Sequence, residues 1–551
     1  MEKYQAFNAA VLKTVKPQNS NMRMLGKALP LKFSRHICTL STANLTDRHL
    51  PHNNNLACAS KPSDQNPTFQ NVMSLNKILS TCVQSYRIQH TEELFDKMPL
   101  KDVVSWNIML SAFNKTRNPA RVCKYFKEMQ RVGIIPNEYT FSIVLSAVLD
   151  KIFNITVPQI HARVISLGLN LSLFVGSALI RAYAAVGDQM ALSRVFDEMS
   201  AKNITSWNAL VSGYMELGCI SEAQRVFDVM PEKNTVSWTI LVNGYIANRR
   251  INEARSLFNK MSNRNVVSWT VMISGYVQNE RFVDSLKLFC LMVQSDTGPN
   301  HFTFSSVLDA CAGCSSLLMG QQVHSVILKA GVPHDVVLLT SLVDMYGKCG
   351  DIVAAFCIFE SMKNKNLMSW NSIIGGYARH GLATRALEEF ERMIKSGVRP
   401  DQVTFLNILS ACGHGGLVEE GEKHFGSMGA KYGIKAGLEH YTCMVDLYGR
   451  AGQLDKAEEL IKGMPYEPDV VVWGALLGAC GIHSSLELGA FAARGINKLK
   501  EDHPVAYSML SKIHGERGEW NGIVGLRKMM KQRHVKNQKA GSWIESPLSV
   551  R

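Results

Sequence analysis

The chain has 551 residues, of which 46% are hydrophobic and 19% are charged, and its formal net charge is +14. This length exceeds one ordinary globular domain, so several domains or an array of repeats are expected. Residues 1–60 and residues 505–551 each carry a balance of +6, which leaves only +2 for residues 61–504. The bulk charge therefore does not by itself indicate a nucleic-acid-binding protein.

The first 60 residues differ in composition from the rest of the chain. Between Met1 and Thr46 the only acid is Glu2, whereas seven Lys and Arg residues and many Asn, Ser, Thr and Ala residues occur. This composition is typical of an organellar transit peptide, and a disordered basic tail is the alternative. Arg35, shortly before Ile37 and a run of Ser and Thr, favours a mitochondrion over a chloroplast.

The tryptophans reveal an internal repeat. Six of the eight stand in one recurring phrase, and their successive intervals are 101, 31, 31, 101 and 103 residues: Trp106, Trp207, Trp238, Trp269, Trp370 and Trp473. An interval of 101 corresponds to two units of 35 residues and one of 31. Such spacing indicates an array of similar units rather than unrelated domains.

Each unit is predicted to form two helices. The first carries the tryptophan phrase, and the second carries a Phe followed three residues later by a Met, as at Phe258 and Met261. This spacing places both side chains on one helical face, which favours a packed core over a cofactor site. A lone helix pair cannot bury its apolar face, whereas stacked pairs can, so the predicted fold class is an all-α solenoid.

Twelve units of 31–36 residues fill residues 72–469. Their predicted boundaries are 72–102, 103–137, 138–172, 173–203, 204–234, 235–265, 266–300, 301–335, 336–366, 367–401, 402–437 and 438–469.

The units resemble pentatricopeptide repeats of the plant PLS subfamily. VVSWNIMLSAFNKTRNPARVCKYFKEMQRVGIIPN (103–137) is similar to the 35-residue form, VVLLTSLVDMYGKCGDIVAAFCIFESMKNKN (336–366) to the short form, and HFTFSSVLDACAGC (301–314) to the long form. The resemblance implies a right-handed superhelix of helix-turn-helix repeats. Tetratricopeptide repeats keep a constant period of 34 residues, which the mixed spacing argues against.

The pattern changes after residue 469. Residues 470–504, which contain VVVWGALLGACGIHSS, resemble the first E segment that follows PLS arrays, and residues 505–546 resemble the second. Ala540 stands where this second segment usually has Pro. A short tail, 547–551, follows.

No enzyme site is predicted. Many relatives add a zinc-dependent DYW deaminase domain, which needs His-x-Glu followed by Pro-Cys-x-x-Cys. The His-x-Glu triplets at 90–92 and 514–516 have no such Cys pair after them, and Cys311 with Cys314 is one pair too few for zinc. No metal or cofactor is therefore expected. No run of 18 apolar residues occurs, so no membrane partner is expected either.

The resemblance implies that two polar side chains in each unit read one RNA base. One directly follows the aromatic position of the first helix, and the other is the last residue of the unit. Ordinary helix-end residues are the alternative for any single pair, but nine pairs of the same residue types favour base reading. The pairs are Asn76/Asp102, Asn107/Asn137, Ser177/Asn203, Asn208/Asn234, Thr239/Asn265, Thr270/Asn300, Thr340/Asn366, Asn371/Asp401 and Thr442/Asp469.

The family's code then implies a target sequence. Thr or Ser with Asn favours A, Asn with Asp favours U, Asn with Asn favours C or U, and Thr with Asp favours G. The long-form units read poorly in this family. With Y for a pyrimidine and n for any base, the expected target is 5′-U-Y-n-A-Y-A-A-n-A-U-n-G-3′.

The resemblance therefore implies a site-recognition factor for C-to-U editing of transcripts in a plant organelle. The implied partners are single-stranded organellar RNA, a DYW-type deaminase protein acting in trans, and multiple organellar RNA editing factors. One alternative is a factor for RNA processing, splicing or stability. The other, from a different class, is a protein-binding helical scaffold.

Overall fold

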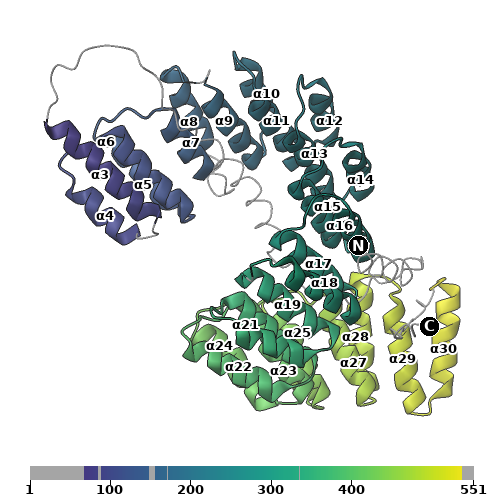
Figure 1. Cartoon of the computed structure of the whole chain (residues 1–551). Helices are drawn as coiled ribbons and strands as arrows, with labels where there is room; N and C mark the ends of the chain where they lie inside the picture. Colours follow the sequence, from purple (N-terminus) through teal and green to yellow (C-terminus); the bar gives the residue numbers. More distant parts are fainter. Residues whose placement is uncertain (1–66, 85–87, 148–155, 170–171, 334, 536–551) are drawn as a thin grey trace. The chain divides into compact units, whose positions relative to one another are not determined.

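The computed structural model describes residues 67–84, 88–147, 156–169, 172–333 and 335–535. In these residues the secondary structure consists of 28 α-helices without a strand (Figure 1). The all-α class predicted from the Trp and Phe spacing is therefore confirmed for the described part. The predicted transit peptide and the end of the second E segment lie outside it.

Two compact units divide the chain, and each consists of successive helices that pack in pairs. The N-terminal unit lies within Pro17–Arg281. It contains α3 (Pro67–Gln84), α4 (Ile88–Lys97), α5 (Val103–Lys115), α6 (Pro119–Arg131), α7 (Glu138–Ala147), α8 (Thr156–Ser166), α9 (Leu173–Val186), α10 (Gln189–Glu198), α11 (Ile204–Glu216), α12 (Ile220–Val229), α13 (Thr235–Ala247), α14 (Ile251–Lys260) and α15 (Val266–Gln278).

The C-terminal unit includes Phe282–Arg551 and has the same construction. It contains α16 (Phe282–Gln294), α17 (His301–Gly313), α18 (Leu317–Ala330), α19 (Val336–Cys349), α20 (Ile352–Ser361), α21 (Leu367–Arg379), α22 (Ala383–Lys395), α23 (Gln402–Gly415), α24 (Val418–Ala430), α25 (Leu438–Arg450), α26 (Leu454–Gly463), α27 (Val470–Ile482), α28 (Leu486–Leu499), α29 (Pro504–Glu516) and α30 (Trp520–Gln532).

A recurring turn joins the two helices of a pair. A residue with positive φ stands two positions before the second helix of twelve pairs, and glycine is the least strained residue for this conformation. The turn therefore gives the second helix the same starting point in each of these pairs. The positive-φ residues are Arg117, Gly187, Gly218, Arg249, Glu280, Ser315, Gly350, Gly381, Gly416, Gly452, Ser484 and Gly518.

The repeated Trp and Phe residues form contacts between successive pairs. Phe258 on the second helix of one pair meets Trp269 on the first helix of the next, with ring centroids 5.0 Å apart and planes at 73°. Edge-to-face packing of this kind favours aromatic contacts beyond their burial. The same contact recurs at Phe95/Trp106, Phe196/Trp207, Phe227/Trp238 and Phe359/Trp370.

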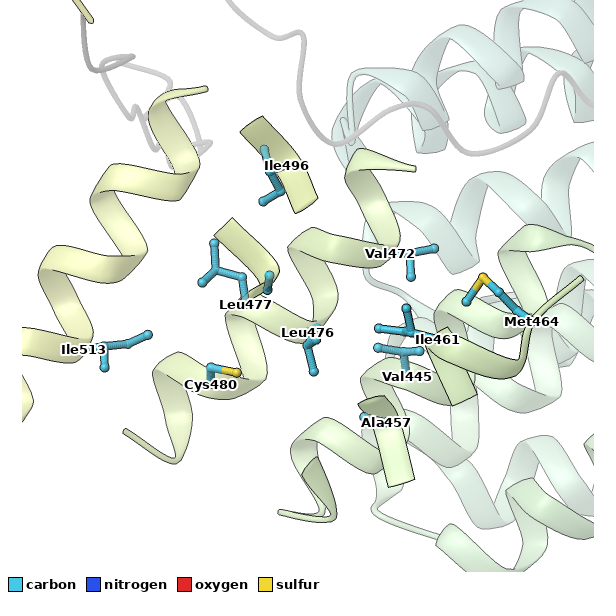
Figure 2. Packing of buried hydrophobic residues seen from close by; sticks show 11 residues of the cluster. Val445, Ala457, Ile461, Met464, Val472, Leu476, Leu477, Cys480, Ile496 and Ile513 are labelled. Atoms are coloured by element: carbon cyan, nitrogen blue, oxygen red, sulfur yellow. The ribbon is translucent and has the colours of Figure 1, made fainter. Parts of the chain in front are cut away.

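The helices after residue 469 continue the stack. Val445 and Ile461, from the last predicted repeat, share one buried cluster with Leu476, Ile496 and Ile513 from the following helices (Figure 2). The core therefore runs without interruption from α25 and α26 into α27, α28 and α29.

Candidate nucleic-acid interface

The last residue of each predicted unit, here called the cap position, precedes the first helix of the next pair. Except at Ser172 and Gly437, its side-chain oxygen accepts a hydrogen bond from a backbone N–H in the first turn of that helix, which satisfies a group that would otherwise lack a partner. All nine predicted residues do this: Asp102, Asn137, Asn203, Asn234, Asn265, Asn300, Asn366, Asp401 and Asp469.

Capping leaves part of each side chain available. At Asn265 the oxygen Oδ1 accepts from the Ser268 N–H at 2.9 Å, so the amide group Nδ2 must point the other way. Asn265 is exposed, and its Nδ2 donates to no residue within the described ranges. A capping asparagine can therefore hold its helix and still offer two donors to a ligand.

The hydroxyl residue three positions after the cap completes this arrangement. At Ser268 the hydroxyl accepts from the Asn265 N–H at 3.0 Å, and the side chain is 1% exposed. Equivalent residues reciprocate the cap in seven other units: Ser105, Thr140, Ser206, Ser237, Thr303, Ser369 and Thr404. This role was not predicted from the sequence, although the Ser or Thr beside the recurring aromatic residue is its signal.

The residue after the aromatic position, here called the inner position, is more buried than expected for a group that reads a ligand. Thr239 is 7% exposed and Asn371 is 5% exposed. Asn107 and Thr442 are the half-buried members of the nine. Thr270 and Asn300 belong to different compact units, so each is placed only within its own unit.

An asparagine at the inner position can bond directly to the cap residue. Asn371 donates from Nδ2 to Oδ1 of Asp401 at 3.1 Å and accepts from the Thr404 hydroxyl at 2.7 Å. Asn76 with Asp102 and Asn107 with Asn137 show the same pattern, with donor distances of 3.0 and 3.1 Å. These three predicted pairs are therefore brought together side chain to side chain.

A Thr or Ser at the inner position bonds to its own helix instead. The Thr239 hydroxyl donates to the Thr235 carbonyl at 2.7 Å, which leaves its oxygen only as an acceptor. The other hydroxyls donate in the same way to the carbonyl four residues earlier, at 2.6–2.9 Å: Ser177, Thr270, Thr340 and Thr442.

Asn208 differs from the other inner asparagines. It is 8% exposed, and its Oδ1 is buried without a hydrogen-bond partner among the described residues. A buried acceptor without a partner costs about 1–3 kcal/mol.

A second feature that was not predicted from the sequence is a set of exposed apolar residues, each two positions after a unit's last residue. Val104 is 53% exposed and Val471 57%, next to the caps at Asp102 and Asp469. Tyr139 and Phe174, at 60% and 68%, stack with ring centroids 6.4 Å apart. Such flat apolar surface beside polar groups can stack against nucleic-acid bases. For Val104 and Tyr139 the sequence signal is an apolar residue directly before the Ser or Thr of the recurring phrase.

Electrostatics at the caps follows from the same hydrogen bonds. Burial alone would raise the pKa of Asp102, but hydrogen bonds from Ser105 and Asn76 outweigh it and lower this pKa below its ordinary value. Asp102 therefore stays charged, and a negative charge at a helix N-terminus is stabilising.

Across the described ranges, no group of three His, Cys, Asp or Glu side chains is arranged to hold a metal ion. His514, from one of the His-x-Glu triplets, instead bonds through Nδ1 to Glu519 at 2.8 Å. None of the described helices has the length and apolar character needed to cross a membrane.

Family models match most of the helical array. The PPR repeat family matches residues 101–150, 264–313 and 365–414, and the PPR repeat matches 205–235, 236–266, 337–367, 403–431 and 439–467. The pentatricopeptide repeat domain matches residues 160–206. The E motif matches residues 483–545.

Curated relatives come from Arabidopsis thaliana. One pentatricopeptide repeat-containing protein is 35% identical over 472 residues, which cover 85% of this chain and 69% of the relative. A chloroplastic relative is 34% identical and a mitochondrial one 32%, over 86% of this chain in each case. The chain spans 48% and 64% of these two proteins.

Among solved structures, the pentatricopeptide repeat protein PPR10 in complex with an 18-nt psaJ RNA element is similar. It is 18% identical, the alignment covers 91% of this chain and 79% of that chain, and the TM-score is 0.43.

Proposed function

Since this chain belongs to the pentatricopeptide repeat family, we propose that it binds single-stranded RNA of a plant organelle in a sequence-specific way. The observation that carries the proposal is the recurring cap residue, which holds a helix with one polar atom and keeps another available. These caps recur at the spacing of the repeat, so each unit can address one base.

The Thr/Asn pairs have the groups that adenine requires. The Thr239 oxygen keeps an acceptor, and the Asn265 amide keeps its donors. The Watson–Crick edge of adenine presents an amino donor and a ring-nitrogen acceptor. We therefore assign A to the Thr/Asn and Ser/Asn pairs.

The Asn/Asp pairs have a different set of groups. At Asp401 the oxygen Oδ1 already accepts from Asn371 and from the start of α23, and the second carboxylate oxygen remains an acceptor. Uracil presents a ring N–H donor that a carboxylate can accept. We therefore assign U to Asn371/Asp401 and to Asn76/Asp102, and the exposed apolar residues would stack against the same bases.

The specific role that we propose is selection of a cytidine for C-to-U editing, with a DYW-type deaminase protein and multiple organellar RNA editing factors as partners. The match of the E motif to residues 483–545 supports this role. The relatives include proteins named as mitochondrial and chloroplastic, and the basic N-terminal composition favours the mitochondrion.

The decisive binding experiment uses the expected 12-nucleotide target in fluorescence anisotropy at several salt concentrations, because phosphate contacts make affinity salt-dependent. A second oligonucleotide carries G at the four A positions. We expect the first to bind at least tenfold more tightly. Equal affinity would refute the assigned bases, and no binding to either at any salt concentration would favour a protein-binding scaffold.

The editing role has a separate test. Organellar RNA sequencing of a plant line without this protein should show one or a few cytidines that are no longer converted. If all cytidines are converted but a short protected RNA end disappears, the protein acts in RNA processing or stability instead.

A further inference from the structure

The last described helix, α30, differs from the other second helices in what covers it. Trp520 is its first residue and is 69% exposed, Val524 is 66% exposed, and none of its residues is fully buried. The first residues of α14 and α22, Ile251 and Ala383, are 8% and 5% exposed. Trp520 is therefore an exposed aromatic residue at a place where the apolar first residues of the other pairs are buried or half-buried.

The turn geometry establishes that these places are equivalent. Trp520 stands two residues after Gly518, whose φ is +71°, as Ile352 follows Gly350 and Ala383 follows Gly381. All these helices therefore start at the same point of their hairpins.

At three places in the C-terminal unit, Phe282, Ile352 and Ala383, this first residue packs against a glycine of the following helix. A Cβ at Gly313 would lie 2.5 Å from the ring of Phe282, and one at Gly415 would lie 2.5 Å from Ala383. The glycine therefore leaves a notch on the following helix, because it has no side chain, and the first residue fills that notch. In the described part of the chain no helix follows α30, and no described glycine lies against Trp520.

The positive charge around Trp520 indicates which kind of partner can bind to this part of α30. Helix α30 contains Arg527, Lys528 and Lys531 and no acidic residue, and all three cations are exposed. Residues 536–551 carry three cations and one acid, so the chain's own tail has the same sign of charge as α30. A second copy of α30 would repel the first for the same reason.

We propose that the Trp520 surface, defined by Trp520, Val524, Lys528 and Lys531, is the docking site for an acidic helix of the protein recruited in trans. That helix carries a glycine or alanine notch that receives Trp520, and its carboxylates face the two lysines. It takes the place of the next helix of the stack. This inference rests on the proposed recruitment of a deaminase and names the surface that performs it.

The test measures binding of a purified DYW-type deaminase protein to the full chain by isothermal titration calorimetry. We expect Trp520→Ala with Val524→Ala to weaken this binding at least tenfold, because a buried Trp is often a dominant contact. We expect Lys528→Glu with Lys531→Glu to weaken it also and to reduce its salt dependence. The matched control is Met190→Ala with Val353→Ala, which removes equally exposed apolar side chains from α10 and α20.

Each other outcome overturns the proposal, and RNA affinity measured on the same samples separates it from the binding function. Equal deaminase binding by all variants would place recruitment elsewhere. Loss of RNA affinity in the Trp520 variant would identify RNA as the occupant. Loss of deaminase binding after removal of residues 536–551, with no effect of the Trp520 variant, would place the docking site in the tail. No binding by the unmodified chain would remove recruitment itself and leave RNA recognition intact.

Discussion

Two equivalent pairs of polar residues, Asn371/Asp401 and Thr239/Asn265, are connected differently. In the first pair the inner asparagine bonds to the cap aspartate at 3.1 Å and to the Thr404 hydroxyl at 2.7 Å. In the second pair the inner threonine donates to a carbonyl of its own helix at 2.7 Å. In both pairs the cap residue holds the start of the following helix through one oxygen.

The difference shows that one scaffold can present opposite hydrogen-bonding groups. The Asn/Asp pair is a closed network whose remaining group is a carboxylate oxygen, an acceptor. The Thr/Asn pair is open and offers a hydroxyl oxygen together with an amide donor. Because the cap bond is common to both, exchange of the residues should alter recognition without loss of the helix.

The largest expected effect comes from converting one pair into the other. Asn371→Thr with Asp401→Asn should change the preferred base at that unit from U to A. The ratio of the two affinities should change about 100-fold, because a well-made base contact provides about 1–3 kcal/mol of discrimination and both bases are affected. Anisotropy with oligonucleotides that differ only at this base measures the ratio.

The control for this exchange is thermal unfolding, which should change little because asparagine also caps helices well. An unchanged preference for U, in a protein with unchanged stability, would show that this pair does not select the base.

A somewhat smaller effect is expected when the open pairs receive an inner asparagine. Thr239→Asn and Thr270→Asn should each weaken binding about tenfold, and only for targets with A at their own positions, because the hydroxyl acceptor is replaced. Targets with a pyrimidine at those positions measure the selectivity. Uniform weakening across all targets would indicate a damaged fold instead.

The sequence predicted the stack of helix pairs well, because the spacing of Trp, Phe and Met reports directly which face of each helix is buried. The predicted unit 235–265 contains one such pair, α13 and α14, which begin at Thr235 and Ile251. It placed the pairs of polar residues by resemblance, and three of them are in direct contact.

The hydrogen-bond pattern within each pair could not be predicted in this way. Whether Thr239 bonds to its own helix or to the cap depends on how far its side chain extends. The spacing of residues in the sequence does not report this distance. The buried hydroxyl at Ser268 was not predicted, because the sequence does not distinguish a small polar residue beside Trp269 from the other residues of an apolar helix. Its role emerges only when the N–H groups at the helix start are counted.

A smaller effect separates capping from recognition at Asn265. Asn265→Ala should reduce the free energy of unfolding by about 1 kcal/mol, because the cap bond to α15 is lost. Asn265→Asp should keep or slightly raise stability, since a carboxylate caps the helix and favours its N-terminus. The Asp variant should shift the preference of the pair from A towards G about fivefold. Chemical denaturation and anisotropy of both variants measure the two effects, and parallel losses in both would contradict separate roles.

The smallest expected effect is a pH dependence of stability at Asp102, which is connected like Asp401. Hydrogen bonds from Ser105 and Asn76 lower its pKa in the folded chain despite burial. Its contribution is therefore present above the pKa of the unfolded chain, about 3.9, and is lost as the pH falls through that value towards the lower folded one. Asp102→Asn should remove this component, so the unmodified chain should lose more stability than the variant in urea unfolding between pH 5 and pH 3. Identical losses would mean that the network around Asp102 does not favour the charged carboxylate, and that the closed pairs owe their arrangement to geometry alone.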